Sequence, residues 1–250
     1  MGSDSVDEKK INRFTQLINN SQRTVFFGGA GVSTESGVKD YRSEDGLYNT
    51  VREYGVSPET ILSHSFFVSN PETFYDFYYK YFLEIDVLPN TAHEVLAEME
   101  KKGKLSSVIT QNIDGLHQKA GSKRVYELHG SVLRNNCMDC GKFYDLDFIM
   151  DESNCRDGIP VCPDCGGIIK PDVVLYEEAL DDRVIRGAVD AIASADTLIV
   201  GGTSLVVYPA AGLIHYFNGD KIILSNKSET DADRSADLVI HDSIGKVLGD

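Results

Sequence analysis

The chain of 250 residues has no apolar run as long as the roughly 20 residues that a membrane-spanning helix needs. Its first ten residues, Met1 to Lys10, are polar and charged, so they lack the apolar centre of a secretory signal. We therefore expect a protein that does not associate with membranes and that is located in the cytoplasm.

Basic residues are also scarce. Lys and Arg together number 24 against 39 Asp and Glu, which gives a formal net charge of -15. Nucleic-acid affinity comes largely from Lys and Arg displacing counterions, so we expect no nucleic-acid partner. A basic peptide would be steered toward such a surface, although the charge is equally consistent with a role in solubility alone.

Cysteine is absent outside one short segment, since all five cysteines lie between residues 137 and 165. Disulfide frameworks usually belong to small secreted chains, so local clustering in a long chain favours a metal site. Four of the cysteines form two matched pairs, Cys137-Met138-Asp139-Cys140 and Cys162-Pro163-Asp164-Cys165, with a glycine after each pair.

The two cysteine pairs have the spacing of zinc knuckles. Four thiolates complete a tetrahedral site and leave no position for water, so one structural zinc is expected at Cys137, Cys140, Cys162 and Cys165. A redox dithiol is the alternative for a single pair, and the second pair argues against it. Cys155 has no neighbour at this spacing and is interpreted as a bystander.

Apolar runs at 24–27, 105–110, 197–200, 221–224 and 238–240 predict buried strands. Helical patterns at 7–20, 182–193 and 209–217 lie between or beside these strands. A further helix is predicted to begin at Asn70-Pro71, and another at Thr91, where Glu94 would complete a capping box. This alternation predicts an α/β fold with a doubly wound parallel sheet.

Two segments interrupt the alternation of strands and helices. Residues 43–90 are helical and aromatic, and residues 132–170 contain the cysteines and many turn-forming residues. We interpret both as insertions that together form a smaller lobe, while about 1–42, 91–131 and 171–250 form the sheet lobe. A cleft between lobes is a usual place for a ligand.

A glycine turn, Gly29-Ala30-Gly31, follows the first predicted strand, and Ser33 and Thr34 are candidate N-caps of a helix after it. Such a turn brings backbone N–H groups to a pyrophosphate. Thr34 stands where the third glycine of the usual dinucleotide fingerprint belongs, so a hydride-transferring dehydrogenase fits poorly. A tight turn without a ligand remains the alternative for this element alone.

Polar side chains gather after the strand that ends at Thr110, in Gln111, Asn112 and Asp114. Ligands collect at the carboxyl ends of parallel strands, although a simple polar turn would look the same. His129, beside Gly130 at the predicted lobe junction, is a candidate general base because imidazole titrates near neutrality; a structural role is its alternative.

Taken together, these motifs resemble the sirtuins, NAD-dependent protein lysine deacylases, and most closely the bacterial members. The resemblance extends over nearly the whole chain. Its motifs are Gly29-Ala30-Gly31-Val32-Ser33, Ser36-Gly37, Asp40-Tyr41-Arg42, Gln111-Asn112-Ile113-Asp114, His129-Gly130, the two knuckles, Pro171-Asp172-Val173-Val174, Gly202-Thr203-Ser204, Pro209-Ala210 and Asn226.

The resemblance implies a Rossmann-type domain with a smaller zinc-ribbon and helical lobe, within one catalytic domain over 1–250. It implies that NAD is cleaved to nicotinamide while the acyl group of a protein or peptide lysine passes to ADP-ribose. His129 would be the general base and Asn112 a second catalytic residue. The residues implied to bind NAD are Gly29, Ala30, Gly31, Thr34, Tyr41, Arg42, Gln111, Asn112, Ile113, Asp114, His129, Gly202, Thr203, Ser204, Asn226, Ser243 and Ile244.

On the substrate side, the resemblance places Val174 and Tyr176 beside the acyl-lysine. Tyr176 and Glu177 stand where the family commonly has Phe-Gly, so Glu177 adds a charge beside the peptide groove. Family members that remove acidic acyl groups carry an arginine three residues after a tyrosine. Here the position three residues after Tyr78 is Tyr81. We therefore expect an uncharged acyl group, acetyl first.

Two rival functions remain at this point. One is a protein ADP-ribosyltransferase on the same fold, against which the presence of His129 argues. The other is a non-catalytic zinc-ribbon module that binds nucleic acid or protein, against which the acidic charge and the complete set of NAD motifs argue.

Overall fold

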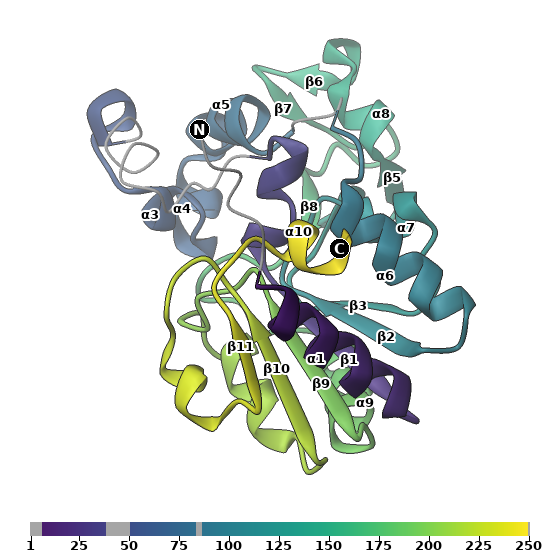
Figure 1. Cartoon of the computed structure of the whole chain (residues 1–250). Helices are drawn as coiled ribbons and strands as arrows, with labels where there is room; N and C mark the ends of the chain where they lie inside the picture. The colour runs from purple at the N-terminus through teal and green to yellow at the C-terminus, as the bar shows by residue number, and fades with distance from the viewer. Residues whose placement is uncertain (1–6, 39–50, 84–86, 250) are drawn as a thin grey trace.

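A six-stranded parallel sheet forms the centre of the computed structural model, which describes residues 7–38, 51–83 and 87–249 (Figure 1). Its strand order is β11-β10-β9-β1-β2-β3. Numbered along the sheet domain alone, this is the order 3-2-1-4-5-6 of the doubly wound Rossmann fold, which confirms the predicted fold class. The strands are β1 (Thr24–Gly28), β2 (Leu105–Thr110), β3 (Val125–Glu127), β9 (Thr197–Gly201), β10 (Lys221–Ser225) and β11 (Leu238–Ile240).

Strand β1 is at the point where the strand order reverses, with β2 on one side and β9 on the other. All five of its residues are buried, and Phe27 is in register with Ile109 and Val200. A strand buried on both faces reads as a continuous apolar run, which is why β1 was recognisable from the sequence. The carboxyl end of β1 leads directly into the glycine turn.

Helices cover both faces of the sheet. On one face, Phe26 packs in a cluster with side chains of α1 (Glu8–Asn20), α6 (Thr91–Lys101) and α10 (Ile244–Gly249). On the other, Val25 and Phe27 pack with α9 (Asp182–Ala193) and the 3₁₀ helix η4 (Ala210–Tyr216). The opposite directions of successive side chains in a strand account for this division. Within the described residues, no helix is long and apolar enough to span a membrane.

Helix α6 begins at Thr91, as predicted, but its capping residues differ from the prediction. The N-cap is Asn90, not Thr91, and its side chain accepts a hydrogen bond from Ala92 N at 2.9 Å. The capping box is closed by His93, whose Nδ1 accepts from Asn90 N at 3.2 Å, so Glu94 takes no part. Asparagine is among the best N-cap residues, which explains why the cap is Asn90.

Two predicted helices are 3₁₀ segments instead of α-helices. After the glycine turn the chain forms η1 (Ala30–Val32) and η2 (Thr34–Ser36), and Gly37 ends the second with φ of 92°. Ser33 makes no capping bond because its hydroxyl bonds Asp114. Residues predicted as a helix over 209–217 form η4, a 3₁₀ helix.

The helix α7 (Leu116–Ala120) lies beside α6, and the 3₁₀ helix η5 (Asp231–Ser235) lies beside β10. The other elements gather at one end of the sheet (Figure 1). Three antiparallel strands in the order β5-β4-β8 and a two-stranded hairpin β6-β7 contain the cysteine segment. The elements here are α3 (Pro58–Ile61), α4 (His64–Ser69), α5 (Pro71–Tyr81), β4 (Gly130–Cys137), β5 (Phe143–Asp145), α8 (Leu146–Met150), η3 (Glu152–Asn154), β6 (Cys155–Arg156), β7 (Ile159–Pro160) and β8 (Ile169–Val173).

One hydrophobic cluster joins the two segments predicted as insertions. Phe74 and Phe77 of α5 pack in it with Val132, Tyr144 and Ile169 from the cysteine segment. The helix α5 begins at Pro71 after Asn70, as predicted, and its aromatic side chains Phe74, Tyr75, Phe77 and Tyr78 are buried in the core. The limits given above for the two lobes remain our proposal.

Candidate active site and metal centre

The glycine turn after β1 packs against a second turn that follows β9. Gly31 N donates to the Gly202 carbonyl at 2.8 Å, and a Cβ added at Gly31 would lie 2.8 Å from Gly202 Cα. A Cβ at Gly29 would meet Thr203 Cβ at 2.9 Å. Gly202 itself has φ of 60°, a conformation that favours glycine. Close backbone packing between the two turns therefore requires these glycines.

Asn226 at the end of β10 holds the second turn in place. Its Oδ1 accepts from Thr203 N and its Nδ2 donates to the Thr203 carbonyl, both at 2.9 Å. The Thr203 hydroxyl accepts from Gln111 Nε2 at 3.0 Å. Three strand ends, those of β2, β9 and β10, are thus linked by side chains that the sequence had singled out.

Ser33 connects two residues of the polar segment after β2. Its hydroxyl donates to Asp114 Oδ2 at 2.6 Å and accepts from Asn112 Nδ2 at 2.9 Å. The other carboxylate oxygen, Oδ1, accepts from Leu116 N at 2.9 Å. Asp114 and Asn112 therefore have fixed side chains, positioned from the loop that follows the glycine turn.

A buried histidine pair lies behind Ser33. His93 Nδ1 accepts from Asn90 N, so the neutral ring carries its hydrogen on Nε2, which faces the Ser33 hydroxyl at 3.5 Å. The ring of His117 lies edge-on to His93 with centroids 4.7 Å apart. Burial lowers the pKa of His93, and burial together with His93 lowers the pKa of His117 to about 3. Both rings are therefore neutral near pH 7.

His129 lies at the junction between β3 and β4. Its Nδ1 is 2.9 Å from the Gln111 carbonyl oxygen, and its own carbonyl accepts from Val174 N at 3.0 Å. Gly130 follows with φ of 77°, and a Cβ there would lie 1.9 Å from the Asp172 carbonyl oxygen. Glycine is thus required where β4 begins to pair with β8, and this pairing sets the backbone position of His129.

The segment after β8 is held against the helical insertion. Tyr176 N donates to the Leu62 carbonyl at 2.9 Å, and His64 N donates to the Tyr176 carbonyl at 3.0 Å. Glu178 accepts from Lys170 Nζ at 3.0 Å and lies 2.8 Å from His64 Nδ1. This segment and the α3–α4 connection therefore form one wall.

A cleft of about 690 Å³ brings these elements together. Within the described residues, every candidate cofactor or substrate residue lines it. Tyr41 and Arg42 lie outside the described residues. The lining includes Gly29, Ala30, Gly31, Thr34, Gln111, Asn112, Ile113, Asp114, His129, Val174, Tyr176, Gly202, Thr203, Ser204, Asn226, Ser243 and Ile244.

Sequence reasoning missed several residues that organise the cleft. The sequence did not place His93 beside Ser33, and Glu35 was not singled out. Glu35 accepts from Ser243 Oγ at 2.8 Å and from Gly245 N at 2.9 Å, which joins the glycine-turn loop to the start of α10. These partners are separated by more than 200 residues, so no local pattern reveals the pairing.

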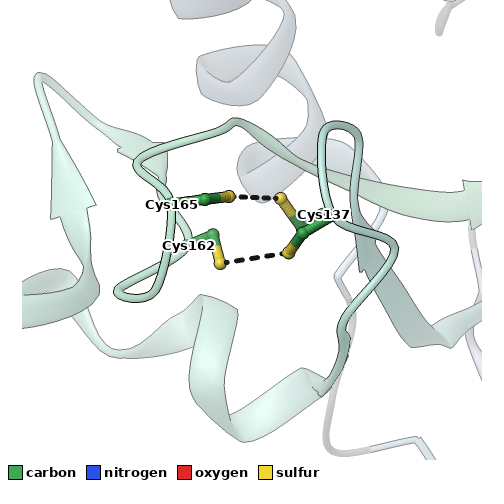
Figure 2. Close-up of side chains that lie close together, drawn as sticks. Cys137, Cys162 and Cys165 are labelled. Carbon is green, nitrogen blue, oxygen red and sulfur yellow. Dashed lines mark hydrogen bonds between the residues drawn. The ribbon is translucent and has the colours of Figure 1, made fainter.

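The four paired cysteines converge on one point. Their sulfurs all lie within 4.8 Å of one another, and Figure 2 shows those of Cys137, Cys162 and Cys165 turned toward one another from two facing turns. The distance from Cys137 Sγ to Cys165 Sγ is 3.4 Å, and that from Cys140 Sγ to Cys162 Sγ is 3.7 Å. Zinc–sulfur bonds of about 2.3 Å in a tetrahedron place sulfurs about 3.8 Å apart, so the four thiols fit zinc.

The two knuckles have matching backbone geometry. Gly141 N donates to the Cys137 carbonyl at 2.9 Å, and Gly166 N donates to the Cys162 carbonyl at 2.8 Å. Both glycines are in the left-handed region, with φ of 71° and 78°. Cys155 is outside the group of four and contacts Tyr79 OH at 3.8 Å, as expected for a bystander.

Tyr144 is a neighbour of the metal centre that the sequence did not reveal. Its hydroxyl lies 2.9 Å from Cys162 Sγ and lowers the pKa of that thiol to about 6. A lower pKa favours the thiolate that a metal requires. Tyr144 is buried in the hydrophobic cluster that joins α5 to the cysteine segment, so the metal centre and that cluster share a side chain.

Comparisons with known proteins agree with this geometry. A Sir2 family profile matches residues 29–209. An NAD-dependent protein deacetylase of Clostridium perfringens (strain 13 / Type A) is 60% identical over 243 residues, covering 97% of this chain and 98% of the relative. One of Clostridium acetobutylicum is 59% identical, covering 96% of each chain.

Solved structures lead to the same family. A Sir2 complex with deacetylated p53 peptide and 3′-O-acetyl-ADP-ribose has a TM-score of 0.87 and 38% identity, covering 96% of each chain. A Sir2–p53 peptide–NAD⁺ complex has a TM-score of 0.85 and 38% identity, covering 96% of this chain and 95% of the other. The chain therefore belongs to the Sir2 family.

Proposed function

We propose that this protein is an NAD-dependent protein lysine deacetylase, which releases nicotinamide and transfers the acetyl group to ADP-ribose. The observation that carries the proposal is the cleft that His129, Asn112 and Asp114 line together with the glycine turn. Membership of the Sir2 family and 60% identity to a named deacetylase support it. These relatives are named as deacetylases, which supports deacetylation over protein ADP-ribosylation.

On the cofactor side, we assign the pyrophosphate to the glycine turn of Gly29, Ala30 and Gly31, with Thr34 beside it. Backbone N–H groups in such a turn suit phosphate oxygens. We assign the adenosine half of NAD to the residues that follow strands β9, β10 and β11. These are Gly202, Thr203, Ser204, Asn226, Ser243 and Ile244, all of which line the cleft. Tyr41 and Arg42 keep their proposed role in the loop that covers the cofactor.

NAD supplies a ribose carbon whose bond to nicotinamide breaks during the reaction. We assign Ile113 and Asp114 to the nicotinamide group and Gln111 to the neighbouring ribose. Both Asp114 oxygens accept protein hydrogen bonds, from Ser33 and Leu116, so the carboxylate is oriented before the cofactor binds. A side chain that is already oriented loses little conformational entropy when the substrate binds, which favours catalysis.

We assign the general base to His129, with Asn112 as the second catalytic residue. The Gln111 carbonyl can only accept, so Nδ1 carries the hydrogen in the neutral ring. Nε2 then has the lone pair that takes a proton from a ribose hydroxyl. Asn112 is held by Ser33 at 2.9 Å, on the same face of the cleft as Asp114.

On the substrate side, we assign the acyl-lysine to the segment after β8. The Val174 carbonyl would accept the amide N–H of the acyl-lysine, and Tyr176 would line its path. An uncharged acyl group, acetyl first, remains the proposed preference. Tyr78 is buried, and the position three residues later is Tyr81, whose hydroxyl bonds Glu53 at 2.7 Å, so no arginine pairs an acidic acyl group there.

Zinc would be structural in this scheme, because four thiols leave no open position for chemistry. It would join the two turns of the cysteine segment and support the wall that carries His129 and Val174. Thiols stay available for zinc where they are kept reduced, so we place the enzyme in the cytoplasm.

The proposal is tested by incubating the protein with an acetyl-lysine peptide with and without NAD and following the peptide by mass spectrometry. Loss of the acetyl group only when NAD is present is the expected result. An acetyl-lysine peptide that stays intact with NAD, or ADP-ribose that becomes attached to a protein, would contradict the proposal. Faster turnover of a succinyl-lysine peptide than of the acetyl-lysine peptide would contradict the acyl preference.

A further inference from the structure

Glu177 has a backbone conformation that side chains rarely adopt. Its φ is 76°, in the left-handed region that favours glycine, at the position where the resemblance expects glycine. Non-glycine residues persist in this region when surrounding contacts hold them there, and such residues often occur at binding sites. The contacts that hold Glu177 can be identified.

Ser65 at the start of α4 fixes the Glu177 carboxylate. Its backbone N donates to Oε2 at 2.9 Å, and its hydroxyl donates to Oε1 at 3.0 Å. The preceding residue, Tyr176, bonds Leu62 and His64 through its backbone. The carboxylate of Glu177 is therefore held in one place on the cleft wall.

The negative charge of Glu177 is not neutralised by these contacts, because both donors belong to an uncharged serine. The neighbouring Glu178 differs, since Lys170 lies 3.0 Å from its carboxylate. Glu177 is exposed and lines the cleft together with the exposed Glu59 of α3. Among the described lining residues, the sole Lys or Arg is Lys227, which follows Asn226 on the cofactor side.

The position of Glu177 along its segment indicates which part of a substrate it would meet. Val174, the proposed partner of the acyl-lysine amide, lies three residues earlier. An extended chain advances about 3.3 Å per residue, so the two positions are separated by about 10 Å at most. A peptide that pairs beside this segment would bring a side chain two or three positions from the acyl-lysine to the carboxylate.

We propose that Glu177 is a specificity-determining residue that selects substrates with Lys or Arg two or three positions from the acyl-lysine. This inference rests on the proposed function, because it uses the assignment of the peptide to the segment after β8. The expected preference is modest, since the carboxylate is exposed and screened by salt. We expect a basic peptide to bind about five- to tenfold more tightly than the matched acidic peptide at low ionic strength.

The test measures binding of three labelled acetyl-lysine peptides by fluorescence anisotropy. They are identical except for Arg, Gln or Glu at the flanking positions. The variants are Glu177→Gln, which removes the charge and keeps the size, and Glu177→Gly, which also relieves the left-handed conformation. Glu72→Gln is the control, because Glu72 is an exposed carboxylate of α5 that lies outside the cleft lining.

We expect the ratio of Arg-peptide to Glu-peptide affinity to fall to about twofold or less in both Glu177 variants and to stay at the wild-type value in Glu72→Gln. Equal affinities for the three peptides in the wild type would overturn the proposal. So would a ratio that Glu177→Gln leaves unchanged, or a loss of affinity equal for all three peptides. Binding needs no turnover, so turnover of the Gln peptide tests the proposed function separately.

Discussion

The ring of His129 is oriented by Gln111, whose carbonyl oxygen lies 2.9 Å from His129 Nδ1. Because a carbonyl only accepts, this contact selects the ring form with its hydrogen on Nδ1 and its lone pair on Nε2. Gln111 in turn donates from Nε2 to the Thr203 hydroxyl. A single residue therefore connects the proposed base to the turn that follows β9.

Replacing His129 with Ala should lower the rate of deacetylation by about 10²- to 10⁴-fold, the usual contribution of a general base. The fold should be retained, since His129 Nδ1 bonds a backbone oxygen at the cleft and the ring belongs to none of the hydrophobic clusters described above. Initial rates with a saturating acetyl peptide, beside a circular dichroism spectrum, check both points. A variant that is folded and retains more than a tenth of the wild-type rate would rule out this role for His129.

Replacing Ser33 with Ala should lower kcat/KM for NAD by about tenfold or more. The substitution removes the hydroxyl that donates to Asp114 at 2.6 Å and accepts from Asn112 at 2.9 Å, and a bond to a charged group contributes about 1.5–3 kcal/mol. Ser106→Ala is the control, because its hydroxyl bonds the Thr24 carbonyl in the sheet, outside the cleft lining. If the two variants have equal kinetic constants, Ser33 does not position the nicotinamide site.

The pH dependence of stability should include a contribution from His117. Burial holds its pKa at about 3 in the folded protein, against about 6.5 when unfolded. The unfolded chain therefore binds the proton more readily, so stability is present above pH 6.5 and is lost as the pH falls toward 3. Between pH 7 and pH 5 the loss should be about 2 kcal/mol.

Urea unfolding of the wild type and of His117→Leu at pH 7 and pH 5 measures this contribution. The variant should lose less stability over that range, and the four cysteines common to both proteins cancel any effect of zinc release. Equal losses in the two proteins would show that His117 does not resist protonation in the folded state.

Zinc binding should depend on Cys162 but not on Cys155. Cys162→Ala removes one of four converging sulfurs, so metal analysis should find much less than one zinc per chain, with faster hydrogen exchange over residues 132–170. Cys155→Ala should keep one zinc per chain, because this thiol lies outside the group. Zinc retained by the first variant, or lost by the second, would contradict the assignment of ligands.

Features that depend on short stretches of sequence could be predicted. The buried run at Thr24–Gly28, the glycine turn and the two knuckles each depend on a few consecutive residues, and the structure has all of them. The order of the strands was implied only by the resemblance. The sequence alone gives alternation, and the observed order comes from β1 pairing with both β2 and β9.

Features that depend on distant partners could not be predicted. Ser33 was expected to cap a helix, but its hydroxyl instead donates a hydrogen bond to Asp114, 81 residues away. The contact of Tyr144 with Cys162 likewise depends on how β5 folds onto the second knuckle. Competition between a local cap and a tertiary hydrogen bond is decided by packing that the local sequence does not contain.

The central claim is that removal of the acetyl group consumes NAD in a defined ratio. The most direct measurement is the number of nicotinamide molecules released per acetyl group lost, with O-acetyl-ADP-ribose measured in the same reaction. The account predicts a ratio of one, no nicotinamide release without the acetyl peptide, and an equal amount of O-acetyl-ADP-ribose. Nicotinamide release that does not depend on the peptide, or free acetate as the first product, would contradict it.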